Sequence, residues 1–187
     1  AEQSGKLVII CGRPGKFSAG FDLSIMGQGG DAMLDLLREG AGLSRRLLNF
    51  PAPVILAVSG HALAMGALLL LSADYRIGVR GNYKIGLNEV AIGMTLPYFG
   101  VELARARLAS AHLDKAVGLA QIYAADGAVA AGYLDEAVEE GDLLSRAVDA
   151  AEQLAGLNME AHQNTKSRVR AELNAALDAA FEKELGV

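Results

Sequence analysis

Two short stretches of the sequence combine residue types that could act directly on a substrate. The stretch KFSAGFDL, residues 16–23, joins small side chains to one carboxylate, Asp22. Small side chains allow a backbone to come close to another group. The stretch GLNEVAIG, residues 86–93, places Glu89 between apolar residues. Burial would raise the pKa of Glu89, which suits a base that takes and returns a carbon-bound proton. An exposed turn glutamate is the alternative.

The other polar candidates fit structural roles better than catalytic ones. We expect Asp22 to cap the next turn or to accept hydrogen bonds from loop amides. His61 is expected to be half-buried with a hydrogen-bond partner, and a general-base role is the alternative. His112 and His162 follow helical periods and are expected at the surface or at an interface.

Several other classes of site lack their usual patterns. Ser18 and Ser59 do not lie in a G-x-S-x-G motif, and residues 12–15, GRPG, do not form a phosphate-binding loop. No His, Cys and Asp cluster has metal-ligand spacing, so no metal is expected. Cys11 follows a strand pattern and is expected to be a buried structural thiol without an internal disulfide, which fits a reducing compartment.

Apolar runs separated by turn residues predict the elements that position these stretches. We expect a helix over residues 31–49 with Asp31 as its N-cap, and a buried helix over residues 64–72. The expected strands cover residues 6–12, 54–58, 74–78 and 83–87, the last two around a turn at 80–82. This order predicts an α/β fold.

The pattern becomes helical beyond residue 96. The predicted helices cover residues 97–108, 110–120, 127–132, 142–157 and 159–183, with Ser110 as an N-cap. We therefore expect an α/β core over residues 1–96 and a helical region over residues 97–187, within one continuous catalytic unit. Lys166, Arg168 and Arg170 are expected to form a solvated helix face, and contact with phosphate groups of a substrate is the alternative.

The composition indicates a packed domain. Of 187 residues, 52% are hydrophobic and 21% are charged, which argues against disorder. The net charge of −5 argues against a nucleic-acid partner. The N-terminal AEQSGK is polar, unlike a signal peptide, and the longest apolar run is about half of a membrane span. We expect a cytoplasmic protein without a membrane partner.

Three motifs together resemble the crotonase superfamily, the enoyl-CoA hydratases and isomerases. They are FSAGFDL (17–23), PVILAVSGHALAMGALLLLSADYRIG (53–78) and KIGLNEVAIGMTLPYFG (84–100), in the order and spacing of that family. The resemblance covers about residues 5–140. It implies a crotonase-like ββα spiral core with a C-terminal helical trimerisation region, and a homotrimer or hexamer.

The resemblance also implies the site. The backbone N–H groups of Ala19 and Met65 would form an oxyanion hole for the enolate of an acyl-CoA thioester, and Glu89 would move the proton. The substrate is the acyl-CoA itself, and no further cofactor is implied. The remaining pocket residues would be Gly20, Phe21, Asp22, Leu23, Gly66, Leu68 and Pro97.

The sequence departs from the family pattern in two places. Hydratases carry a second glutamate where this chain has Leu68, so a single carboxylate favours double-bond isomerisation, with hydration as the alternative. The family also has an N-terminal segment ahead of the first strand, which this sequence lacks, so an open sheet edge is expected. Both departures leave open a crotonase-like chain that binds acyl-CoA or a protein without turnover.

Overall fold

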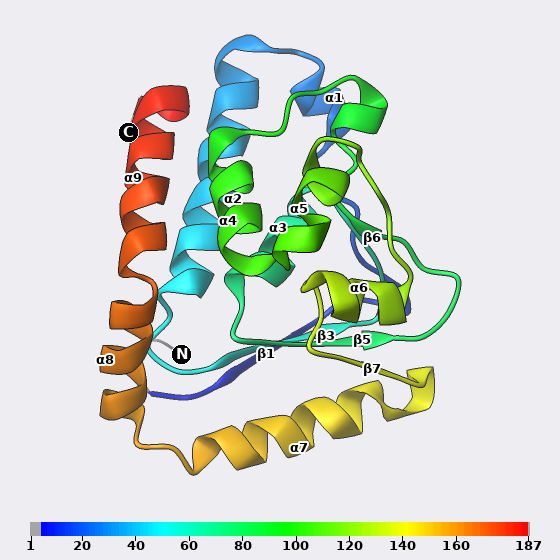
Figure 1. Ribbon diagram of the computed structural model, residues 1–187, viewed down its shortest axis with the longest axis vertical. Helices are drawn as coiled ribbons and strands as arrows, with labels where there is room; N and C mark the ends of the chain where they lie inside the picture. The colour runs from blue at the N-terminus through cyan, green and yellow to red at the C-terminus, as the bar shows by residue number, and fades with distance from the viewer. Residues whose placement is uncertain (1–4, 187) are drawn as a thin grey trace.

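The computed structural model describes residues 5–186 and confirms the α/β prediction. Two parallel β-sheets are surrounded by helices (Figure 1). The helices are α1 (Leu23–Met26), α2 (Gly30–Leu48), α3 (Met65–Ser72), η2 (Val90–Ile92), α4 (Tyr98–Arg107), α5 (Ser110–Val117), α6 (Ala125–Ala131), η3 (Glu140–Asp142), α7 (Leu143–Ala155), α8 (Met159–Val169) and α9 (Ala171–Leu185). None of the helices within residues 5–186 is both long and apolar enough to cross a membrane.

The larger sheet has four parallel strands in the order β1-β3-β5-β7. They are β1 (Val8–Cys11), β3 (Val54–Val58), β5 (Tyr75–Val79) and β7 (Glu136–Val138). All five residues of β3 are buried, because helices cover both faces of a central parallel strand. β1 lies at one edge of the sheet, as the sequence predicts.

The smaller sheet carries the segments that surround the predicted site. Its parallel strands β2 (Gly15–Ser18), β4 (Gly60–Leu63) and β6 (Ile85–Gly86) lie in that order. Each strand runs directly toward one candidate stretch: β2 toward Ala19, β4 toward α3, and β6 toward Glu89. Parallel pairing therefore brings these three segments to the same end of the sheet.

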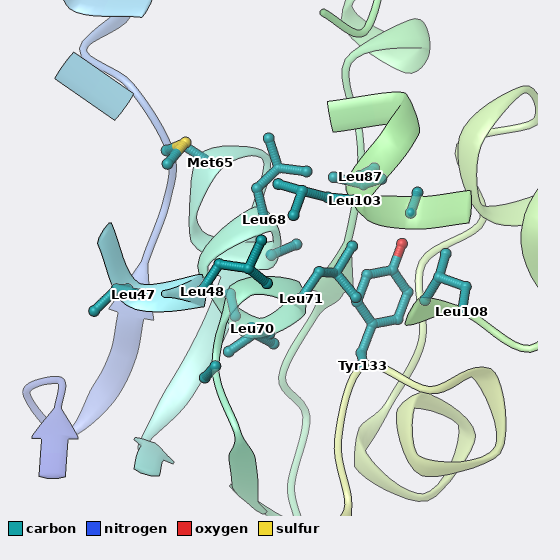
Figure 2. Close-up of a cluster of buried hydrophobic side chains, with 14 of the residues drawn as sticks. Leu47, Leu48, Met65, Leu68, Leu70, Leu71, Leu87, Leu103, Leu108 and Tyr133 are labelled. Atoms are coloured by element: carbon teal, nitrogen blue, oxygen red, sulfur yellow. The ribbon is translucent and has the colours of Figure 1, made fainter. Parts of the chain in front are cut away.

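The main core lies between the sheets and the layer of α2, α4 and α9, which run side by side in Figure 1. α3 crosses this core, and seven of its eight residues are buried. In Figure 2, Leu68 and Leu71 of α3 converge with Leu103 of α4 and with Tyr133. Ile55 and the other side chains on the opposite face of β3 pack in a separate cluster against α7.

The structure differs from the sequence prediction in how several strands are used. β2, β4 and β7 were not predicted, and β7 adds a strand from the helical region to the larger sheet. The strands predicted around the turn at residues 80–82 are β5 and β6, which belong to different sheets. These strands are short and acquire their partners from distant parts of the chain, so local pattern gives little sign of them.

Three predictions about single residues are wrong. Cys11 is exposed rather than buried, because β1 is an edge strand. The N-cap of α2 is Gly29, and Asp31 lies in the first turn. Ser110 is the first residue of α5, whose N-cap is Ala109.

The predicted helix over residues 159–183 is interrupted at Arg170, which separates α8 from α9. Lys166 and Arg170 are buried and form ion pairs with Asp74 at 2.6 and 2.9 Å. They are therefore not part of a solvated helix face, and only Arg168 of that trio is exposed. The half-buried carboxylate of Asp74 holds α8 against the end of α3.

The turn between β4 and α3 contains a strained residue. Ala64 has φ 51° and ψ −122°, a conformation that disfavours any residue with a Cβ and costs about 1–3 kcal/mol. Its carbonyl oxygen accepts the amide N–H groups of Ala67 and Leu68, at 2.9 and 3.1 Å. The strain is thus held in place by the first turn of α3.

We predict that Ala64→Gly raises the free energy of unfolding by about 1 kcal/mol, because relief of strain exceeds the added freedom of the unfolded chain. Ala67→Gly, within α3, is the matched control and should lower stability by about 1 kcal/mol or more. Urea unfolding measures both. Equal losses in the two variants would show that Ala64 is not strained.

Candidate active site

An apolar pocket of about 110 Å³ lies where the three strands of the smaller sheet end. Apolar side chains make up most of its wall, and Glu89 is the one carboxylate among the lining residues that the structure describes. The lining residues are Ala19, Phe21, Leu23, Met26, Leu37, Ala64, Leu68, Asn88, Glu89, Ile92, Met94 and Pro97. Segments far apart in sequence thus meet around a single acidic group.

Glu89 lies just after β6 and immediately before η2. Its side chain is buried at 7% exposure, and its Oε2 atom has no hydrogen-bond partner within residues 5–186. Burial raises the pKa of the Glu89 carboxyl above its usual value, and a hydrogen bond with its own backbone opposes the shift. The expectation of a buried carboxylate is confirmed, and the exposed-turn alternative is wrong.

The loop after β2 and the start of α3 approach each other closely beside this pocket. A Cβ built on Gly20 would lie 2.8 Å from the Cβ of Ala64 and 3.4 Å from the nitrogen of Met65. A Cβ on Gly66 would lie 2.6 Å from the carbonyl oxygen of Ser18. Glycine is therefore required at both positions for the two segments to meet.

This approach places two amides with unused donors near the pocket wall. Within the described part of the chain, neither the N–H of Ala19 nor that of Met65 donates to an acceptor in a loop, turn or helix cap. Met65 is the first residue of α3, where an amide has no partner inside its own helix. The sequence-based prediction assigns these two N–H groups to one substrate oxygen.

Met65 contributes its side chain to the core rather than to the pocket. A Cβ on Gly40 of α2 would lie 2.5 Å from Cε1 of Phe21 and 3.2 Å from the sulfur of Met65. The Phe21 ring and the thioether therefore pack over the same glycine.

The other predicted pocket residues have different roles in the structure. Phe21, Leu23, Leu68 and Pro97 line the pocket. Gly20 and Gly66 are not lining residues but permit the close backbone approach. Asp22 is exposed and is not among the residues that line the pocket.

Asp22 is exposed and is the N-cap of α1. Its Oδ1 accepts the N–H of Ser24 at 2.8 Å and the hydroxyl of Ser24 at 2.6 Å. The side-chain hydrogen bond from Ser24 lowers the pKa of the Asp22 carboxyl. The predicted capping role of Asp22 is confirmed.

His61 takes the structural role that the sequence predicts, whereas His112 and His162 are half-buried rather than at the surface. His61 is half-buried, and its Nδ1 accepts the backbone N–H of Lys84 at 3.0 Å. His112 lies 3.2 Å from the hydroxyl of Tyr123. Among residues 5–186, no group of three or more His, Cys, Asp or Glu side chains is arranged to hold a metal ion.

Two features of the site were missed at the sequence level. Asn88 lines the pocket beside Glu89, and its Oδ1 is buried without a hydrogen-bond partner among the described residues. Its position next to the glutamate was the available signal. The positive φ of Ala64 had no signal, because alanine gives no local indication of that conformation.

The chain also matches a known protein family. A family model described as enoyl-CoA hydratase/isomerase matches residues 1–187. The chain belongs to the enoyl-CoA hydratase/isomerase family. The resemblance drawn from the three sequence motifs is thereby confirmed.

Solved structures of this family share the fold closely. An enoyl-CoA hydratase/isomerase family protein from Pseudomonas syringae is 47% identical with a TM-score of 0.97, over 100% of this chain and 81% of that one. A Mycobacterium tuberculosis protein is described as an enoyl-CoA isomerase in one solved structure and as a probable enoyl-CoA hydratase in another. The first of these structures is 42% identical with a TM-score of 0.91, over 96% of this chain and 78% of that one. These matches confirm the crotonase fold.

Curated relatives of the enoyl-CoA hydratase/isomerase family are more distant in sequence. Human mitochondrial enoyl-CoA delta isomerase 1 is 29% identical over 166 residues, which are 88% of this chain and 55% of that protein. A short-chain-enoyl-CoA hydratase from Clostridium acetobutylicum is 32% identical over 75% of this chain and 54% of that protein. The chain thus spans about half the length of these curated relatives, which include both an isomerase and a hydratase.

We predict that Glu89→Gln changes the pH dependence of stability. A carboxyl whose pKa is raised by folding favours the folded state below its unfolded-state pKa. That advantage is lost as pH rises through the folded-state pKa. The variant should therefore match the wild type in mild acid and exceed its free energy of unfolding by about 1 kcal/mol or more at alkaline pH.

Urea unfolding over a pH series measures this difference. The control is Glu140→Gln, an exposed glutamate of η3 that does not line the pocket, which should follow the wild type at every pH. A constant difference between Glu89→Gln and the wild type across the series would contradict a raised pKa at Glu89.

Proposed function

We propose that this chain forms the catalytic core of an enoyl-CoA isomerase, which moves the double bond of a 3-enoyl thioester to the 2-position. The observation that carries the proposal is the single carboxylate of Glu89, whose Oε2 atom has no partner among residues 5–186, in an otherwise apolar pocket beside the backbone amides of Ala19 and Met65. The family supplies the substrate class, an acyl-CoA. No cofactor beyond the thioester is required.

The two amides would stabilise the charge that develops on the thioester oxygen. When a proton leaves C2, the electron pair delocalises onto that oxygen as an enolate. The N–H groups of Ala19 and Met65 would donate to it, and one such donor contributes about 3 kcal/mol to the transition state. Both donors are backbone groups held by the β2 loop and by α3, so little reorganisation accompanies the charge.

Glu89 would carry the proton between two carbons. Its carboxylate breaks the C2–H bond, the double bond moves from C3–C4 to C2–C3, and the carboxylic acid returns the proton to C4. The reaction is balanced, since no electrons or water are exchanged. A raised pKa makes the carboxylate a stronger base and brings its affinity for the proton closer to that of the carbon acid.

Leu68 favours isomerisation over hydration. Hydration adds water across the double bond and requires a water molecule held between an acid and a base. Leu68 is 1% exposed and occupies the pocket wall where the family's hydratases have a second glutamate. An apolar side chain at this position cannot orient water, whereas one carboxylate is sufficient to shuttle a proton.

Two thioesters distinguish the possible activities by ultraviolet absorbance. An isomerase produces the conjugated chromophore from 3-hexenoyl-CoA, and a hydratase removes it from crotonyl-CoA. We expect the first reaction to be the faster. Faster loss of crotonyl-CoA absorbance would make the protein a hydratase, and no change with either would make it a binder without turnover.

We predict that Glu89→Gln lowers the rate of 3-hexenoyl-CoA isomerisation by about 10²-fold or more, because the amide cannot accept the proton. The fold should persist because the two side chains are nearly isosteric. Glu140→Gln is again the matched control and should retain full activity. A Glu89→Gln rate above roughly a tenth of the wild-type rate is incompatible with the proposed base.

We also predict that Leu68→Glu introduces or increases crotonyl-CoA hydration, because it supplies the second carboxylate. A buried glutamate should also lower the free energy of unfolding, by about 1–3 kcal/mol or more if it remains unpaired. Leu68→Gln is the control, with a similar polar burden and no carboxylate. A folded Leu68→Glu variant without any gain in hydration would show that the pocket has no room for the water.

The protein is further proposed to assemble as a homotrimer or hexamer. Large apolar side chains outside the pocket remain exposed, including Leu119 at 75% and Val169 at 78%. Closed rings form when a heterologous interface closes. Gel filtration with light scattering tests the proposal: a mass of three or six chains is expected, and a mass of one chain at micromolar concentration would contradict it.

A further inference from the structure

A second cavity, of about 470 Å³, lies at the other end of α3 from the pocket that contains Glu89. It is formed where α8 and the end of α4 meet the Ala73–Asp74 corner after α3. Four charged side chains line it: Asp74, Arg107, Lys166 and Arg170. Three of them are cations, so the lining carries a net positive charge of two.

The one carboxylate in the lining is fully engaged. Asp74 accepts Lys166 Nζ at 2.6 Å, a guanidinium nitrogen of Arg170 at 2.9 Å, and the backbone N–H of Val54 at 2.8 Å. Lys166 also donates to the carbonyl oxygen of Phe50 at 2.9 Å. These bonds account for Lys166 and Arg170 as structural groups that hold α8 in place.

The hydrogen bonds of Arg107 do not explain its burial in the same way. One of its terminal nitrogens donates to the carbonyl oxygen of Ala73 at 2.9 Å, which stabilises the C-terminal end of α3. Its Nε atom is buried and has no hydrogen-bond partner among residues 5–186. The same is true of Nε2 of His162, another lining residue.

The charge around Arg107 is unbalanced. Burial, followed by repulsion from Arg76 and Arg170, lowers the pKa of Arg107 to about 10. Arg107 therefore remains a cation at neutral pH. Arg76 forms an ion pair with the carboxylate of Asp135 at 2.7 Å, so this carboxylate is not available to accept a hydrogen bond from Arg107. A cation without a paired anion is unfavourable in a partly buried site, and an anion in the cavity would balance its charge.

We propose that this cavity is a binding site for a small oxyanion of the phosphate class, held by the guanidinium of Arg107 with Lys166 and His162 beside it. A tetrahedral oxyanion offers several acceptors to a guanidinium, which suits the planar fork of arginine. The anion would neutralise the two excess positive charges. The inference stands independently of the reaction at Glu89, because it rests on a different cavity.

Inorganic phosphate is the probe, and potassium chloride at matched ionic strength is the reference. The melting temperature of the wild type should rise in phosphate beyond its value in chloride, and calorimetric titration should give a saturable isotherm. Arg107→Met should weaken phosphate binding about tenfold or more, the effect of one charge-assisted hydrogen bond. Arg105→Met, on the exposed face of the same helix, removes the same charge and should leave the affinity unchanged.

Arg107→Lys covers the case in which Arg107→Met does not fold. It keeps the charge and a donor for Ala73 but lacks the planar guanidinium fork, and should weaken phosphate binding severalfold. The proposal is overturned if phosphate stabilises the wild type no more than chloride, or if Arg105→Met weakens binding as much as Arg107→Met. A third outcome also overturns the proposal. If phosphate does not stabilise the wild type, and light scattering shows that Arg107→Met no longer self-associates, the cations bind a carboxylate of a second copy.

Discussion

The proposed chemistry depends on one close contact between two backbone segments. The loop after β2 and the first residues of α3 can meet only because Gly20 and Gly66 have no side chains. We propose that these sequence-distant segments present the amides of Ala19 and Met65 to the same substrate oxygen. The smaller sheet sets this contact, since β2 and β4 pair in parallel and end together.

The burial of Glu89 and the strain at Ala64 follow from the same contact. α3 must start sharply at the end of β4, and Ala64 takes a conformation usually left to glycine to allow it. The helix then packs Leu68 into the pocket wall opposite the strand that leads to Glu89. A carboxylate oxygen without a partner inside an apolar wall is unfavourable for stability, and it is useful to a base that must bind a proton from carbon.

The sequence predicts the elements that are long or wholly apolar. β3, α2 and α3 were anticipated because their apolar runs are unambiguous, and the family motifs pointed to Glu89 and its neighbours. β2, β4 and β7 have three or four residues each and contain Lys16, His61 and Glu136, so no local pattern marks them. Lys166 and Arg170 were placed at the surface because their shared partner, Asp74, is about 90 residues away in sequence. Their burial is a property of the tertiary fold.

Infrared spectroscopy of a bound thioester tests the central claim most directly. Butyryl-CoA has no double bond to isomerise, and an isotope-labelled carbonyl isolates its stretching band in a difference spectrum. If the amides of Ala19 and Met65 both donate to the thioester oxygen, the C=O bond is polarised and its band moves to lower frequency than in water. A bound thioester whose carbonyl band stays at its frequency in solution would contradict the account.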